Sequence, residues 1–233
     1  MSTLKACLLV LPLLPLLGCA TISSNRSSLL APGVRSGAKA PRSIGGGWLA
    51  LCQTGANQWT LLPTSVQNRR VHDDQVDKPG EKTGREFRSN LPAALCLLRH
   101  GSIRAGRVEA ADFKSVRPAE VNLLNRLGLG VPAFFSIDSY LVRASDLEKT
   151  PSSYALSVSV NSGAPQVLGE FERGTDPARE SVVLIWAGDL NRDGVADFVF
   201  EHKAPNQKSQ SLYLSQKAGG GYQRAGLDLW TGN

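Results

Sequence analysis

The stretch Trp186-Ala187-Gly188-Asp189-Leu190-Asn191-Arg192-Asp193-Gly194-Val195-Ala196-Asp197-Phe198-Val199-Phe200 decides the fold expected for this chain. Two apolar runs, at residues 182–186 and 196–200, flank its polar centre. They are rich in β-branched and aromatic residues, which favour strands over helices. Gly194 permits a sharp bend of the backbone between them. The stretch therefore predicts two β-strands joined by a tight loop.

The loop carries oxygen-bearing side chains at regular spacing. Asp189, Asn191 and Asp193 recur at every second residue, and Asp197 follows four residues later. Calcium binds six to eight oxygens from carboxylates, amides, backbone carbonyls and water. One tight turn can aim the alternate side chains inward, and Val195 would add a carbonyl. The spacing favours a structural Ca²⁺ site at these five residues over a metal-free Asx turn.

Two known calcium loops share part of this pattern. An EF-hand also begins D-x-N-x-D-G, but it closes with a glutamate at position twelve, where this chain has Phe200. The segment from Gly188 to Asp197 resembles the G-D-x-N-x-D-G-x-x-D core of FG-GAP/VCBS-type repeats. In that family the loop joins two strands and binds Ca²⁺, and residues 211–215 resemble the strand that follows. A propeller needs several blades and the sequence holds one copy, so the resemblance implies only the loop and its hairpin.

The N-terminus has the pattern of an export signal. Lys5 supplies a positive charge, and residues 6–17 are apolar but too short to span a bilayer. Leu16-Leu17-Gly18-Cys19 resembles the lipobox of bacterial lipoproteins. The resemblance implies removal of residues 1–18, acylation of Cys19 with fatty acids such as palmitate, and attachment to a membrane. Because Ala20 rather than aspartate follows, it implies the outer membrane, on its periplasmic side or at the surface. The alternative is an ordinary secretory signal with a chance cysteine.

The rest of the chain divides by composition. Residues 19–47 are rich in Ser, Ala, Gly, Pro and Arg without an apolar period, which predicts a flexible tether. Residues 48–233 predict one mainly β domain, an antiparallel sheet or sandwich with the calcium-type hairpin at 182–202 and one short helix at 118–127. Further strands are expected at 48–52, 59–66, 93–98, 103–108, 133–142, 154–160, 167–171, 211–215 and 226–230.

Two cysteines remain in the processed chain besides Cys19. Cys52 and Cys96 both lie in apolar, strand-like runs. Because the periplasm and the cell surface are oxidising, we expect a disulfide between them. Two buried free thiols are the alternative, since a thiol packs well as a small apolar group.

Charge and motifs limit the classes of function. The formal net charge is +6, yet no run of Lys and Arg is interleaved with aromatics, so nucleic acid is not an expected partner. The G-x-S-x-G, H-E-x-x-H and C-x-x-C motifs and phosphate-binding glycine loops are absent from the sequence, and no catalytic residue is assigned. His72-Asp73-Asp74 is interpreted as a solvated turn.

Three classes of function follow from these observations. The favoured one is a lipid-anchored envelope protein whose Ca²⁺-stabilised β domain is a binding or structural module. The second is a module that binds an envelope glycan or protein through exposed aromatics, to which Trp48, Trp59, Trp186 and Trp230 could contribute. Core packing is the alternative role for these tryptophans. An enzyme with an unrecognised site ranks third.

Overall fold

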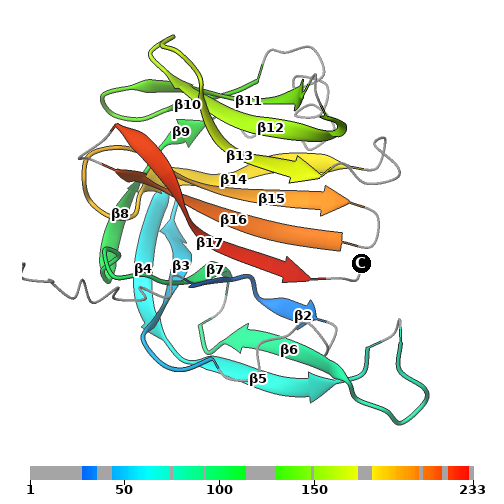
Figure 1. Ribbon diagram of the computed structural model, residues 1–233. Helices are drawn as coiled ribbons and strands as arrows, with labels where there is room; N and C mark the ends of the chain where they lie inside the picture. The colour runs from blue at the N-terminus through cyan, green and yellow to red at the C-terminus, as the bar shows by residue number, and fades with distance from the viewer. Residues whose placement is uncertain are drawn as a thin grey trace, which may run out of the picture.

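The structure is a computed structural model that describes residues 28–35, 44–73, 76–91, 93–113, 130–147, 150–172, 180–204, 207–216 and 220–230. Within these ranges the chain forms seventeen β-strands in three sheets and no helix, which confirms the mainly β prediction (Figure 1). The expected helix at 118–127 lies outside the described residues. Nothing in the described ranges is a helix with the length and apolarity to traverse a bilayer.

The largest sheet has nine strands, and all neighbours in it are antiparallel. In spatial order they are β1 (Ser28–Leu30), β7 (Ala94–Arg99), β3 (Trp48–Gly55), β4 (Gln58–Thr64), β8 (Gly106–Ala110), β14 (Ser181–Asp189), β15 (Asp197–Ala204), β16 (Gln207–Gln216) and β17 (Gly221–Trp230).

This sheet curls until its two end strands meet. Leu29 of β1 lies against Gly226 of β17, where an added Cβ would come within 2.6 Å of the leucine Cβ. The N–H of Ala31, just after β1, donates to Asp228 of β17 at 2.7 Å. The result is a nearly closed barrel. Its interior is filled by apolar side chains from every one of its strands: Leu29, Leu51, Leu61, Cys96, Leu98, Val108, Trp186, Val199, Leu212, Leu214 and Ala225.

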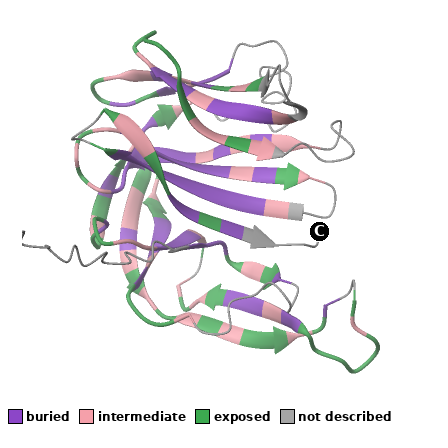
Figure 2. Ribbon diagram, in the orientation of Figure 1, coloured by how far each residue is buried: buried purple, intermediate pink, exposed green. Residues whose placement is uncertain are grey.

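A five-stranded sheet packs on one side of the barrel. Its order is β13 (Gln166–Glu172), β12 (Thr150–Val160), β11 (Ser139–Leu147), β10 (Val131–Phe134) and β9 (Asp112–Phe113). Tyr154, Leu156 and Val158 of β12 are buried on one face, as their alternation predicts, and pack with residues of β14, β15 and β16. Figure 2 shows the purple, buried stretches of these three central strands. The two layers confirm the expected sandwich-like packing.

A β-bulge in strand β14 turns Trp186 into the barrel interior, away from the core between the barrel and the five-stranded sheet. The register of β14 against β15 shifts between Leu184 and Trp186. Leu184 therefore faces the sandwich core, whereas Trp186 points into the barrel. There Trp186 meets Trp59 edge-on, with ring centroids 6.3 Å apart.

The third sheet has three strands and extends away from the barrel at the bottom of Figure 1. Its order is β2 (Gly33–Arg35), β6 (Gly84–Ser89) and β5 (Val66–Val71). Phe87 of β6 is fully buried against Trp48 and Ala50 on the outer face of the barrel. This contact joins the small sheet to the main body.

The N-terminal segment differs from its prediction. Residues 19–47 were expected to be a flexible tether, but Ser28–Leu30 and Gly33–Arg35 are strands. Leu29, Leu30 and Arg35 are buried. The tether prediction is therefore wrong for residues 28–35, because these short strands find their partners in distant parts of the chain.

Candidate functional site

The 189–197 loop connects β14 to β15, as the sequence predicts. Asp189 ends the first strand and Asp197 begins the second, and Gly188 and Asp197 are register partners. The turn itself uses left-handed backbone at Arg192 (φ 62°) and Gly194 (φ 86°). Such φ values favour glycine, which accounts for Gly194 at this position.

The loop side chains accept hydrogen bonds from the backbone of the loop. Asp189 accepts from the N–H of Asp193 at 3.0 Å and from the N–H of Gly194 at 2.9 Å. Asn191 accepts from the N–H of Asp193 at 3.1 Å, and Asp193 accepts from the N–H of Val195 at 2.9 Å. These are Asx-type contacts that fix the turn.

Asp197 has a different role, since it ties the loop to the next strand. One oxygen accepts from the N–H groups of Leu190 at 2.7 Å and Asn191 at 3.3 Å. The other accepts from the N–H of Ser215 at 2.7 Å and from its hydroxyl at 2.9 Å. The same hydroxyl lies 2.9 Å from Asp193. Ser215 of β16 is therefore a site residue that the sequence analysis did not assign, although it lies in the strand singled out after the loop.

Burial makes the Asp197 carboxylate hard to ionise. Its side chain is completely buried. Burial and, to a smaller extent, the nearby Asp193 carboxylate raise the pKa of Asp197 to about 7, although the hydrogen bonds from Ser215 and Leu190 oppose the shift. A bound cation would act in the opposite direction and favour the ionised form.

The loop also lacks a positive partner. In the part of the chain that the structure describes, no Lys, Arg or His side chain forms an ion pair with Asp189, Asp193 or Asp197. Arg192 lies inside the loop, but its guanidinium donates to the carbonyl of Ala105 at 2.8 Å instead. Three carboxylates are thus gathered in one turn without a basic side chain to neutralise them.

The side chains of this loop are of the types that bind a hard cation, but they are not already arranged around a common point. Carboxylate, amide and carbonyl oxygens are the ligands that calcium prefers. Among the described residues, however, no three His, Cys, Asp or Glu side chains come together as a ready metal-binding group. The loop oxygens face backbone N–H groups, and Ca²⁺ binding at Asp189, Asn191, Asp193, Val195 and Asp197 stays a prediction.

The two cysteines do not form the expected disulfide. Cys52 and Cys96 are free thiols on neighbouring strands, but Cys96 is the register partner of Leu51. Cys52 packs toward the small sheet, whereas Cys96 points into the barrel. Adjacent positions on opposite faces cannot bring the two sulfur atoms together. Burial raises the pKa of both thiols.

Trp48, Trp59 and Trp186 do not form an exposed platform, and the side chain of Trp230 lies outside the described residues. Trp48 and Trp186 are buried, and Trp59 is half-buried against Trp186. Trp48 also lies under Arg99, whose guanidinium carbon is 4.8 Å from the ring centroid. Core packing therefore accounts for these three side chains. Phe134 is the one aromatic among the large apolar side chains that are exposed in the described ranges.

The described part of the chain does not bring the remaining candidate, the His72 segment, together with other polar groups into a site. His72 is exposed, and its Nδ1 contacts the carbonyl of Glu81 at 3.0 Å, which agrees with a solvated turn at this residue, whereas Asp73 is buried and does not fit that interpretation. Asp74 lies outside the described residues, as does Cys19 with the rest of the export signal. No protein-family model, curated protein or solved structure matches this chain.

Proposed function

We propose that this protein is a lipid-anchored component of the bacterial cell envelope whose β domain is stabilised by Ca²⁺ and serves as a binding or structural module. The observation that supports it most is the charge of the 189–197 loop, which has three carboxylates, one completely buried, and no basic side chain among the described residues paired to them. The lipobox at Leu16 to Cys19 supports the cellular address.

The residues divide into ligands and positioning groups. Asp189, Asn191, Asp193 and Asp197, with the carbonyl of Val195, would hold the ion, and the ion would supply the positive charge that the loop lacks. Ser215 holds Asp197 and Asp193 in place from β16. Because Asp197 already joins the hairpin to β16, binding at this loop would strengthen the contact among three strands of the barrel.

Thermal unfolding with and without calcium tests the proposal. Extracellular calcium modules bind with dissociation constants of about 10⁻⁴–10⁻³ M. At ten to a hundred times that concentration, mass action would add roughly 1.4–2.7 kcal/mol to the free energy of unfolding. We expect the melting temperature of the wild type to be higher in excess Ca²⁺ than in chelator. Asp193→Ala should lose most of this difference.

Asp112→Ala is the matched control, because it removes an exposed carboxylate outside the loop. This variant should keep the full response to calcium. An unchanged wild-type melting temperature in chelator, together with no heat of Ca²⁺ binding by calorimetry, would show that the loop is an Asx turn without a metal.

A further inference from the structure

Three arginines form a row across the small sheet. Arg85 of the central strand β6 is the register partner of Arg35 on β2 and of Arg70 on β5. Directly opposed residues in antiparallel strands share a face, with Cβ atoms about 4.5–5.5 Å apart. The row therefore places three positive charges on the same face of the sheet, and like charges in such a position are destabilising unless an anion lies among them.

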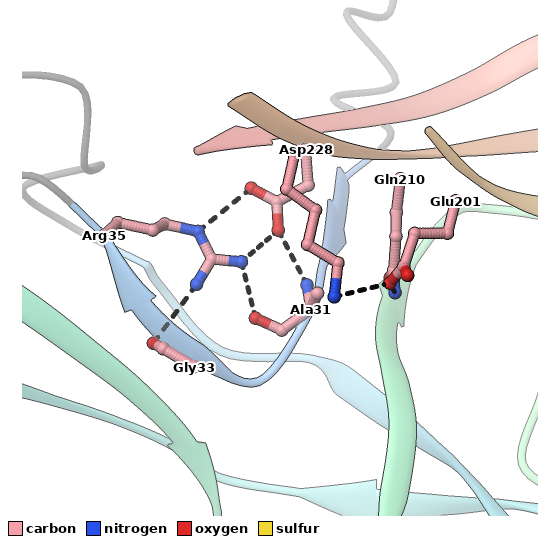
Figure 3. Close-up of polar contacts among 7 residues, drawn as sticks. Ala31, Gly33, Arg35, Glu201, Gln210 and Asp228 are labelled. Carbon is pink, nitrogen blue, oxygen red and sulfur yellow. Dashed lines mark hydrogen bonds and ion pairs between the residues drawn. The ribbon is translucent and has the colours of Figure 1, made fainter. Parts of the chain in front are cut away.

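One end of the row is neutralised from within the protein. Arg35 is 1% exposed and pairs with Asp228 of β17, with Nε donating to one carboxylate oxygen at 3.2 Å and the terminal nitrogen donating to the other. The guanidinium also donates to the carbonyl of Gly33 at 3.2 Å (Figure 3). It lies 5.0 Å from the centroid of the Phe87 ring. Arg35 is thus fixed and buried, so it is not available to a ligand from solvent.

The carboxylate that the small sheet itself supplies, Glu86, is already used on the opposite face. Glu86 accepts from Arg69 at 2.7 Å and from Arg88 at 2.6 Å. Since neighbouring residues of a strand point to opposite faces, this cluster lies on the far side from Arg70 and Arg85. Within the described ranges, Arg70 and Arg85 have neither a carboxylate nor a hydrogen-bond acceptor.

A second unsatisfied polar group lies on the same face. Asn68 precedes Arg70 by two residues on β5, and its buried side-chain oxygen has no partner in the described part of the chain. That oxygen is not accessible to solvent, so an approaching anion meets the two guanidinium groups before the amide. The face therefore combines two unneutralised guanidinium groups with an unpaired amide.

We propose that Arg70 and Arg85, with Asn68 beside them, form a binding site for a phosphate group. A guanidinium offers paired N–H donors in a planar fork that matches two oxygens of a phosphate. Arg85 is half-buried and Arg70 is exposed, so an anion can approach from solvent. The phosphate is either inorganic phosphate or the phosphomonoester of a lipid headgroup. This site is separate from the calcium-type loop and does not depend on it.

Calorimetry with inorganic phosphate on the full chain in a nonionic detergent tests the site. Chelator is present to exclude Ca²⁺, and sodium chloride keeps the ionic strength constant. Wild type should bind saturably. A hydrogen bond to a charged group contributes about 1.5–3 kcal/mol, so the double variant Arg70→Gln/Arg85→Gln should weaken affinity by at least roughly tenfold. Without phosphate, it should unfold at the same temperature as wild type or a higher one, because a repulsion has been removed.

The matched control is Arg69→Gln/Arg88→Gln, which removes the same charge from the opposite face of the same strands. It should retain wild-type affinity for phosphate. If both double variants lose the same phosphate affinity, the binding depends on overall charge and the proposed site is wrong. A wild type that shows no saturable binding of phosphate would also contradict the proposal.

Two short-chain lipids distinguish the sources of the phosphate. Dihexanoyl phosphatidic acid carries a phosphomonoester, and dihexanoyl phosphatidylcholine does not. Tighter binding of the phosphatidic acid than of inorganic phosphate, lost in Arg70→Gln/Arg85→Gln, would assign the site to a lipid headgroup. Tighter binding of inorganic phosphate would assign it to the free anion. Equal binding of both lipids by wild type, with none of inorganic phosphate, would overturn the proposal.

Discussion

At the scale of single residues, His202 shows how burial makes stability depend on pH. It is buried among Tyr154 and Phe171, with ring centroids 5.9 Å away from each. Burial lowers the pKa of His202 below its ordinary value, and the Glu180 carboxylate opposes the shift. The unfolded chain therefore takes up the proton first as pH falls, which favours unfolding.

We expect the His202 contribution to the free energy of unfolding to decrease as pH falls from about 6.5, the ordinary pKa of histidine, toward the lower pKa of the folded state, whereas Asp197, with its raised pKa, contributes in the opposite sense over this range. His202→Phe removes only the histidine contribution, so the pH dependence of its free energy of unfolding should differ from that of the wild type by this amount. His72→Gln alters an exposed histidine and serves as the control. Denaturant unfolding at several pH values measures the effect, and identical slopes for wild type and His202→Phe would contradict it.

The two thiols give a second prediction at this scale. Because Cys52 and Cys96 are free and buried, iodoacetamide should label neither of them rapidly in the folded protein. After unfolding without reductant, both should react, and intact mass spectrometry counts the adducts. If protein from the periplasm reacts only after reduction, the two cysteines are joined in a disulfide.

At the scale of elements, the ion pair between Arg35 and Asp228 fastens β2 to β17. A buried pair is costly to break because one charge is left without its partner. We expect Asp228→Leu to lower the free energy of unfolding by about 3–5 kcal/mol. Arg35→Met/Asp228→Leu should recover most of this loss, since no charge then remains buried. Denaturant unfolding of both variants provides the measurement, and additive losses would show that the two residues act independently.

Sequence pattern predicted those elements whose signal is local. The alternation from Tyr154 to Val160 identified β12, and the spacing of Asp189, Asn191 and Asp193 identified the loop with its turn at Gly194. β1 could not be found in this way: its adjacent leucines, Leu29 and Leu30, face different cores, so they give no period.

The features that could not be predicted from the sequence depend on contacts between strands far apart in the chain. Ser215 belongs to the site because β16 pairs with β15, and Arg35 is buried because Asp228 reaches it from the other end of the chain. The disulfide prediction failed for a similar reason. Cys52 and Cys96 do lie on neighbouring strands, but Cys96 opposes Leu51 and shares its face, so Cys52, the next residue, points to the opposite face.

At the scale of the whole molecule, the position of β1 sets the distance between the fold and its proposed anchor. The chain enters the barrel at Ser28, nine positions after Cys19. Nine residues reach at most about 32 Å when fully extended. The barrel would therefore lie near the membrane surface, whereas a tether that ended at residue 47 would allow a much greater distance.

The anchor itself is tested by Cys19→Ala. Wild type should enter the detergent phase of a Triton X-114 separation and yield a mature N-terminus at Cys19. The variant should stay unprocessed or become water-soluble, because the acylated thiol is lost. A wild-type protein that partitions into water, with its N-terminus elsewhere, would show that the signal is an ordinary secretory one.

The meeting of β1 with β17 has a consequence for how quickly the molecule folds. The hydrogen bond from Ala31 to Asp228 spans 197 positions of the chain, so the barrel has to close one of the longest loops that its sequence allows. Contacts of such large sequence separation lose much chain entropy before they form, and proteins rich in them fold in milliseconds to seconds rather than microseconds. If the chain is exported N-terminus first, as the proposed signal implies, β1 would cross the membrane before β17, the last strand of the barrel to emerge. Until then the apolar barrel interior stays open to chaperones and proteases.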